Sequence, residues 1–328
     1  MSLDVHPVLD VLTEYRRTEG SMNTATMTFA TFLENAAIVP WVLERTHIVA
    51  EKYPSRVLIL NASKPEGEQH AEPPAARGEW VEIGVEGTDP QSLAAAVTSL
   101  ALADAPIVLT WLGRRIAGDP RFAALYTIAR TKIVSTSADD VSASALRDLI
   151  RFYDAHQDAV VHDIAYLRIT PWREVIAEFF DDPTFACELQ RLRRVEITAG
   201  SDSEMFYLIS WLASRLGWAP CASDRFCNSA GEDITFVLHR EGEPRRIRRV
   251  VLQSEGTTFL ADVTDDDPNA VCLEINGEKS RERRSAPLHN LDIASLFERA
   301  LLGSYRQNVF RETLAMARDL IDRQGQSA

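Results

Sequence analysis

The chain has 328 residues, of which 45% are hydrophobic and 25% charged, and its formal net charge is −13. This length suits two domains of ordinary globular composition. The acidic balance argues against nucleic acid, whose phosphates require basic surface. No apolar run reaches the ~20 residues that span a bilayer, and the first 19 residues lack the apolar core of a signal peptide. We therefore expect a cytoplasmic protein without membrane or nucleic-acid partners.

The first half of the chain alternates strand-like with helix-like segments. Its apolar or alternating segments predict strands at 24–33, 56–60, 79–85, 106–112 and 133–134. Helical spacing predicts helices at 36–52, 89–103, 119–129 and 142–153, two of which open with Asp-Pro, an N-cap followed by a residue without an amide proton. A polar stretch at 61–78 is expected to be a surface loop. Strands separated by helices predict a largely parallel sheet.

The second half follows a different pattern. Residues 163–194 look helical and include a helix start at Thr170-Pro171, and Ser201 to Glu204 forms a capping-box sequence for a helix that ends at Gly217. Strands are expected at 194–198, 234–239, 246–252, 257–263 and 270–275, the last four as an antiparallel meander, with helices at 292–302 and 305–323 covering one face.

These patterns together predict three parts. We expect an α/β domain with a largely parallel sheet at 1–155 and a helical connector at 156–192. An α+β domain, with an antiparallel meander and covering helices, follows at 193–328.

Signatures of common enzymes are missing from the sequence. No G-x-G-x-x-G occurs, and Gly113 and Gly118 have Walker spacing but continue into Asp119-Pro120 where a lysine is required. His162-Asp163 has the composition of an acid–base pair, although a surface histidine beside a helix start is the favoured interpretation. We therefore expect no catalytic residues and no nucleotide cofactor.

The four cysteines are Cys187, Cys221, Cys227 and Cys272, and none form C-x-x-C. A zinc site is not expected, because no pair has the spacing to hold a tetrahedral ion. Cys221 and Cys227 lie in a predicted loop at 219–231 and approach one another if that loop folds back. Free thiols are the favoured interpretation, since stable disulfides are rare in the cytosol.

Several segments resemble a known family. They are Tyr53-Pro54-Ser55-Arg56, the strand Pro106 to Trp111, the stretch Asp163 to Glu174 (DIAYLRITPWRE) and Trp211 to Trp218 (WLASRLGW). Over about residues 25–220 their order and spacing resemble the glucose-6-phosphate dehydrogenase assembly protein family, OpcA. The family usually has histidine at the position of Tyr53 and an aromatic residue at that of Thr110, so this chain resembles a divergent member.

The resemblance implies a function without catalysis or cofactor. Family members assist assembly or activation of glucose-6-phosphate dehydrogenase, which supplies NADPH at the entry to the oxidative pentose phosphate pathway. The implied partner is therefore this dehydrogenase. An alternative from another class is an enzyme or sensor that binds a sugar phosphate at the carboxyl end of the N-terminal sheet.

Six residues are candidates for partner or ligand binding. Trp172 and Arg173 either pack within the protein, with Arg173 paired to a carboxylate, or face a partner, and Glu174 stands one position too late for a capping box. Ser55 and Arg56 either bind an anion or cap the preceding helix. Trp111 ends a buried strand where ligands bind in open α/β sheets, although core packing is its favoured role.

Arginines cluster in the second half of the chain. The clusters are 191, 193 and 194; 245, 246, 248 and 249; and 281, 283 and 284. Arginines on both faces of a strand favour an edge strand, where charge discourages unwanted pairing. The alternative is a basic patch for an acidic partner or a sugar phosphate.

Overall fold

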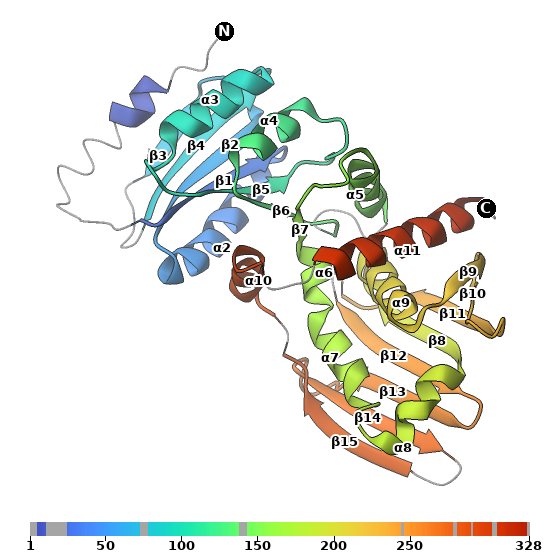
Figure 1. The fold of residues 1–328 in the computed structure, drawn as a ribbon. Coiled ribbons are helices and arrows are strands. Elements are labelled where there is room, and N and C mark those ends of the chain that lie inside the picture. Colours follow the sequence, from blue (N-terminus) through green and yellow to red (C-terminus); the bar gives the residue numbers. More distant parts are fainter. Residues whose placement is uncertain are drawn as a thin grey trace. The chain divides into compact units, whose positions relative to one another are not determined.

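The structure, a computed structural model, describes residues 5–10, 25–72, 78–137, 143–243, 246–277, 281–289, 291–303 and 307–326. The chain forms two compact units, each built from several stretches of sequence (Figure 1). The first unit comprises Met1–Ser135, Ala155–Asp163 and Ile293–Leu302. The second comprises Thr136–Asp154, Ile164–Asp292 and Gly303–Ala328. The linear division at 155 and 192 stays a prediction.

The first unit contains a seven-stranded sheet in the order β3-β4-β2-β1-β5-β6-β7. Its strands are β1 (Met27–Leu33), β2 (Ser55–Pro65), β3 (Gln69–Glu72), β4 (Gly78–Glu86), β5 (Ile107–Leu112), β6 (Thr131–Val134) and β7 (His162–Asp163). All neighbouring pairs are parallel except β3 with β4. The six parallel strands have the doubly wound order, which reverses at β1. The predicted α/β class is confirmed.

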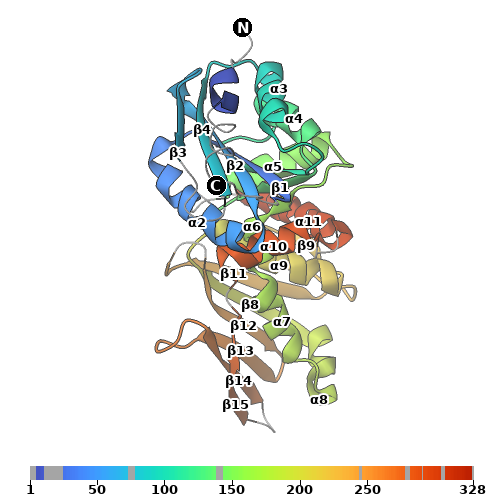
Figure 2. The ribbon, with the colours of Figure 1, turned by 90° about the vertical axis from the view of Figure 1, so that its left-hand side faces the viewer.

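Helices cover both faces of this sheet, α3 and α4 on one and α2 and α10 on the other (Figures 1 and 2). Their bounds are η1 (Ala36–Ile38), α2 (Val39–Lys52), α3 (Pro90–Leu100), α4 (Pro120–Ile128) and α10 (Ile293–Leu301). Both Asp-Pro starts are confirmed: Asp89 accepts from the Ser92 amide at 2.9 Å, and Asp119 from the Arg121 amide at 2.8 Å. The C-terminal α10 places Phe297 edge-on to Phe29 of β1, with ring centroids 6.2 Å apart.

The predicted loop at 61–78 is wrong over its described part. β2 continues to Pro65, and β3 returns antiparallel along β4, while residues 73–77 lie outside the described part of the chain. Some of the polar side chains that suggested a loop form hydrogen bonds within the sheet instead. Glu82 of β4 is 5% exposed and accepts from Asn61 Nδ2 at 2.7 Å and from Lys64 Nζ at 3.0 Å.

The second unit contains an eight-stranded sheet in the order β15-β14-β13-β12-β8-β11-β10-β9. Its strands are β8 (Leu192–Ala199), β9 (Ala219–Ala222), β10 (Arg225–Cys227), β11 (Asp233–Arg240), β12 (Ile247–Ser254), β13 (Thr257–Val263), β14 (Ala270–Gly277) and β15 (Arg281–Pro287). Only β8 and β11 are parallel; the other neighbours are antiparallel. The α+β class is confirmed, but the meander runs from β12 to β15, because β8 separates β11 from β12.

Helices of this unit are α5 (Ser144–Ala155), α6 (Ile164–Arg168), α7 (Thr170–Glu178), α8 (Pro183–Ala186), η2 (Cys187–Arg191), α9 (Asp202–Leu216) and α11 (Gln307–Gln326). Helices α7, α8, α9 and α11 lie on one side of the sheet (Figure 2). The expectation that both C-terminal helices cover this sheet is wrong, because α10 belongs to the first unit. No helix in the described part of the chain has the length and apolarity to cross a membrane.

Two predicted helix caps differ from expectation. Ile169, not Thr170, caps α7, and the Thr170 hydroxyl accepts instead from Arg173 Nη2 at 2.6 Å. Ser201 does cap α9, yet its hydroxyl donates to the Glu204 carboxylate rather than accepting from a backbone amide. Glu204 is 1% exposed and also accepts from Arg168 Nη1 at 2.6 Å, so a buried ion pair replaces the reciprocal capping box.

The favoured prediction of free thiols is wrong for one pair of cysteines. The predicted loop at 219–231 folds into strands β9 and β10, and Cys221 and Cys227 form a disulfide with their Cα atoms 5.8 Å apart. Asp233 lies beside the two sulfurs, but zinc binds thiolates, which a disulfide lacks. Cys187 and Cys272 are free, as expected.

We predict that replacing both Cys221 and Cys227 by serine lowers the free energy of unfolding by about 2 kcal/mol. Closing so short a loop removes about this much chain entropy from the unfolded state. Urea unfolding without reductant measures the loss. Cys187→Ser, which removes an exposed free thiol, is the control and should change little. Equal stability of the double variant and the wild type would contradict a disulfide at this position.

Candidate functional site

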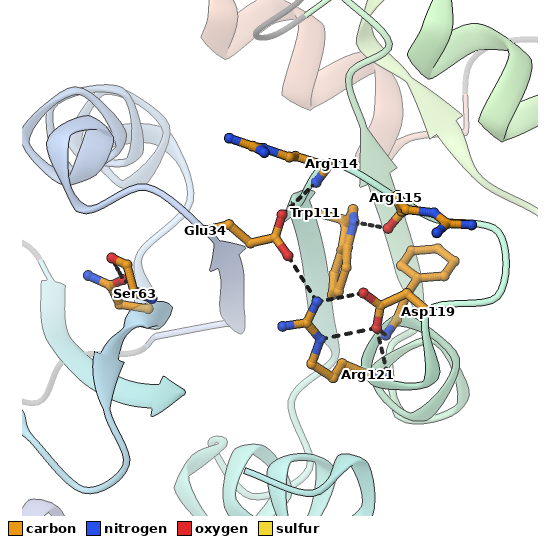
Figure 3. A network of polar contacts seen from close by, with 9 residues as sticks. Glu34, Ser63, Trp111, Arg114, Arg115, Asp119 and Arg121 are labelled. Carbon is orange, nitrogen blue, oxygen red and sulfur yellow. Dashed lines mark hydrogen bonds and ion pairs between the residues drawn. The ribbon is translucent and has the colours of Figure 1, made fainter. Parts of the chain in front are cut away.

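The candidate site lies at the carboxyl end of the first unit's sheet, where the strand order reverses between β1 and β5 (Figure 3). In doubly wound folds, ligands bind beyond the carboxyl ends of the strands at this point. Glu34 directly follows β1, and the segment Gly113 to Asp119 links β5 to α4. The two connections therefore carry the side chains that any ligand at this edge would meet.

A carboxylate–guanidinium network joins these two connections. Glu34 Oε2 accepts from the Arg114 amide at 2.9 Å, and Glu34 Oε1 lies 2.9 Å from Arg121 Nη2. The same Nη2 lies 2.6 Å from Asp119 Oδ2, so Arg121 is held between two carboxylates (Figure 3). Burial raises the pKa of Asp119, but the hydrogen bonds from Arg121 outweigh it and hold that pKa below its ordinary value.

Beneath this network an aromatic stack fills the sheet edge. Trp111 is 2% exposed and stacks on Phe32, with ring centroids 4.0 Å apart and 6° between the planes. Its Nε1 donates to the Arg115 carbonyl at 3.0 Å. A Cβ atom on Gly113 would lie 2.8 Å from the indole, so this position requires glycine. The indole of Trp111 is thus a core group, and contact with a ligand stays a prediction.

The chemistry of this edge disfavours an incoming phosphate. In dinucleotide-binding folds a glycine-rich turn after the first strand brings backbone amides to the pyrophosphate. Here the turn after β1 reads Glu34-Asn35-Ala36-Ala37, without glycine, and it places a carboxylate of the chain itself on an amide of the opposing connection. A phosphate at this position would have to displace Glu34 from the Arg114 amide and from Arg121.

The candidates Ser55 and Arg56 make structural contacts. Ser55 is 1% exposed and donates from Oγ to the Tyr53 carbonyl at 2.9 Å, where α2 ends. Arg56 is 4% exposed and donates from Nη1 to the Leu100 carbonyl at the end of α3. Both side chains thus satisfy carbonyls at helix ends. Anion binding by either stays a prediction.

The candidates on α7 differ in exposure. Trp172 is 3% exposed. Arg173 donates to the Tyr166 hydroxyl at 2.8 Å and lies over the Tyr166 ring at 4.7 Å, whereas Glu174 is exposed. Arg173 thus donates to two hydroxyl groups, those of Tyr166 and Thr170, and its expected pairing with a carboxylate stays a prediction. The contact of these three residues with a partner stays a prediction, and Glu174 is the one already open to solvent.

The arginine clusters occupy different positions in the second sheet. Edge protection is wrong for the second cluster, because β12 lies between β8 and β13; Arg245 is outside the described residues. Arg248 pairs with Asp265 at 2.8 Å, and with Arg246 it lines a pocket of about 230 Å³. The third cluster does lie on the edge strand β15.

The interpretation of His162 as a surface residue is wrong. His162 is 6% and Asp163 0% exposed, because both belong to the short strand β7. Burial, with a smaller effect of the nearby positive charge of Lys132, lowers the pKa of His162 to about 4. The imidazole is consequently neutral in the folded protein at neutral pH.

We predict that His162 makes stability fall on mild acidification. Histidine in the unfolded chain has a pKa near 6.5, so between about pH 6.5 and about pH 4 the unfolded chain binds a proton that the folded chain does not bind. The free energy of unfolding therefore decreases as pH falls from about 6.5 towards about 4. Between pH 7 and pH 5 the loss is about 2 kcal/mol. Urea unfolding at both pH values should show it in the wild type and in the exposed control His47→Gln, but not in His162→Gln. An equal loss in His162→Gln would contradict this origin.

We also predict that the isolated protein does not bind NADP at micromolar concentration and has no dehydrogenase activity. The Glu34 carboxylate and the turn without glycine provide the physical reason. Titration calorimetry measures binding, with an NADP-dependent dehydrogenase as positive control. The variant Glu34→Gln separates the effect of the charge from that of the turn. It removes the charge but restores no glycine turn, so we expect that it does not bind NADP. Micromolar affinity in the wild type would contradict the prediction.

Comparison with solved structures shows which fold the chain shares. A 3-ketoreductase from Actinomadura kijaniata, KijD10, solved with NADP and TDP-benzene, is 10% identical, with a TM-score of 0.51 over 89% of this chain and 94% of that one. The transcriptional regulator Gal80p from Kluyveromyces lactis is 9% identical, with a TM-score of 0.52 over 96% of each chain. One fold therefore serves an enzyme and a regulator, and it does not by itself assign a function.

Sequence comparison shows the family. The OxPP cycle protein OpcA of Nostoc punctiforme is 25% identical over 55% of this chain and 37% of its own length, and that of Synechococcus elongatus 22% identical over 52% and 43%. The chain thus matches less than half the length of either relative. Family models described as the N-terminal and C-terminal domains of a glucose-6-phosphate dehydrogenase subunit match residues 46–151 and 159–314. The chain belongs to the OpcA family of glucose-6-phosphate dehydrogenase subunits.

Proposed function

We propose that this protein is a non-catalytic, cytoplasmic subunit that binds glucose-6-phosphate dehydrogenase and promotes its active oligomer, in support of NADPH supply by the oxidative pentose phosphate pathway. The match of two consecutive subunit domains over most of the chain carries the proposal. OpcA relatives at 22–25% identity agree with it.

The candidate site supports a role other than catalysis. The sheet edge at which this fold receives ligands is occupied by the Glu34 carboxylate and its bonds to Arg114 and Arg121. The same carboxylate disfavours the alternative of a sugar-phosphate enzyme or sensor, since the phosphate would have to displace an internal anion. Binding of another protein requires no such displacement.

Helix α7 is our proposed contact with the dehydrogenase. Glu174 is exposed, whereas Trp172 is buried and Arg173 donates to Tyr166 of its own unit. We therefore assign the direct contact to Glu174 and a supporting role to the other two residues. Polar contacts of this kind tune partner choice and association rate.

We predict that adding this protein to the glucose-6-phosphate dehydrogenase of the same organism raises its activity or shifts its oligomeric state. An activator must bind the active form more tightly than the inactive one, because equal affinity for both shifts nothing. Activity titration together with light scattering on the mixture measures both effects. Unchanged activity and unchanged mass at saturating concentrations would contradict the proposal.

Surface variants extend the same experiment to α7. Glu174→Arg should raise the concentration needed for half-activation about tenfold at an unchanged melting temperature, while Glu86→Arg, an exposed charge reversal in the first unit, is the matched control. Trp172→Ala with Arg173→Ala removes a buried ring, so activation should fall together with the melting temperature. Normal activation by folded Glu174→Arg would remove α7 from the interface.

A further inference from the structure

One face of the second unit's sheet has no helix of the same unit over it among the residues that the structure describes. Phe259 of β13 marks the covered face, because its ring lies 5.5 Å from that of Phe179 and 4.8 Å from that of Phe180, at the end of α7. Neighbouring residues of a strand point to opposite faces. Leu260 therefore belongs to the other face, which we call the outer face; helices α7, α8, α9 and α11 all lie on the opposite side (Figure 2).

The strand register defines the composition of the outer face. Its middle row crosses six strands from β11 to β15 and comprises Val237, Glu196, Val251, Leu260, Glu274 and Arg283. Threonines flank this row at 198, 235 and 258. Val251 is only 7% exposed although no helix lies over it, because its cross-strand neighbours enclose it. The apolar part of this row is small: Val251 and Leu260 lie side by side on adjoining strands, and polar or charged residues surround them. A small apolar centre with a polar surround is compatible with an interface.

Most charged side chains of the outer face pair with one another within the face. Three ion pairs lie on it: Arg194 with Glu196 at 2.6 Å, Arg249 with Asp262 at 3.9 Å, and Arg283 with Glu274 at 3.1 Å. The whole chain carries a net charge of −13, so two copies repel one another over most of their surface. Arg281 lies on the same face, in register with Asn276 and Thr258, and leaves the face close to neutral with a slight positive excess. Such a face is where a second copy of an acidic chain meets least repulsion.

The sheet edge is a poor alternative for pairing. At the β15 edge, residues 281–284 are Arg-Glu-Arg-Arg and all are exposed. Charged side chains on an edge strand discourage the addition of another strand. The face itself approaches the size of an interface: six strands of seven or eight residues span about 25 Å in each direction, or roughly 600 Å² of flat area, and the relief of the side chains adds accessible surface to this. Stable interfaces take about 800 Å² of accessible surface from each partner.

We propose that the outer face pairs two copies of this chain, sheet against sheet, about a twofold axis. Two identical faces then cover each other's apolar centre, in the way that packed sheets in a sandwich do. If the proposed function holds, the pair presents two dehydrogenase-binding surfaces. It then links two dehydrogenase molecules, which gives the subunit a physical means of promoting a larger oligomer.

Sedimentation velocity at about 10 μM tests the pairing without the dehydrogenase. The wild type should sediment with twice the mass of one chain. Leu260→Arg, at the centre of the face, and Thr258→Arg, beside it, should each raise the dimer dissociation constant at least a hundredfold, since they place unpaired charge in the interface. The matched control is Ala177→Arg, which adds the same charge to an exposed position of α7. It should remain dimeric.

Several outcomes would overturn the pairing. A monomeric wild type would contradict it. Leu260→Arg and Thr258→Arg variants that stay dimeric with unchanged circular dichroism would also contradict it. If Leu260→Arg unfolds, the polar position Thr258 decides the matter. If the wild type is monomeric on its own and Thr258→Arg abolishes its binding to the dehydrogenase, the outer face binds the dehydrogenase instead of a second copy. Dimerisation without any effect on the dehydrogenase would leave the pairing intact and refute only the proposed function.

Discussion

Each unit depends on one central strand that is hydrogen-bonded on both sides. β1 pairs in parallel with β2 and with β5, and this double pairing creates the reversal of strand order at which Glu34 and Arg114 meet. β8 pairs in parallel with β11 and antiparallel with β12. Because each strand has only two edges, these pairings decide which strands become neighbours and which residues reach the carboxyl edge of the first sheet.

Local signals predicted much of the fold. The Asp-Pro starts of α3 and α4 and the left-handed Gly217 after α9 lie where the sequence indicated them, since each depends on a few adjacent residues. Strand partnership depends on distant residues. The insertion of β8 between β11 and β12, and the exchange of α10 into the first unit, therefore left no local trace. The polarity of 61–72 predicted a loop, but two of its polar side chains, Asn61 and Lys64, bind Glu82 of the neighbouring strand β4.

The candidate site was predicted less well than the fold. Trp111 was placed at the correct sheet edge from its position after a buried strand, but Glu34 and Arg121 were missed because 87 positions separate them. A usable signal existed: an acid directly after the first strand, where nucleotide-binding folds require glycine. Trp172 is a candidate by its residue type, and its burial is evident only in the folded structure. The type of a residue indicates which interactions its side chain can make, whereas its exposure decides whether a partner can reach that side chain.

The place of α10 has a consequence for biosynthesis. Phe29 and Tyr53, near the start of the chain, contact Phe297 and Glu298, near its end. During synthesis the first unit therefore stays incomplete until residues 293–302 have left the ribosome, although its sheet was translated long before. Domains normally finish folding in order from the N-terminus. Here the two units must mature almost together, and a chain that terminates before residue 293 leaves the α2 face of the first sheet without its second covering helix.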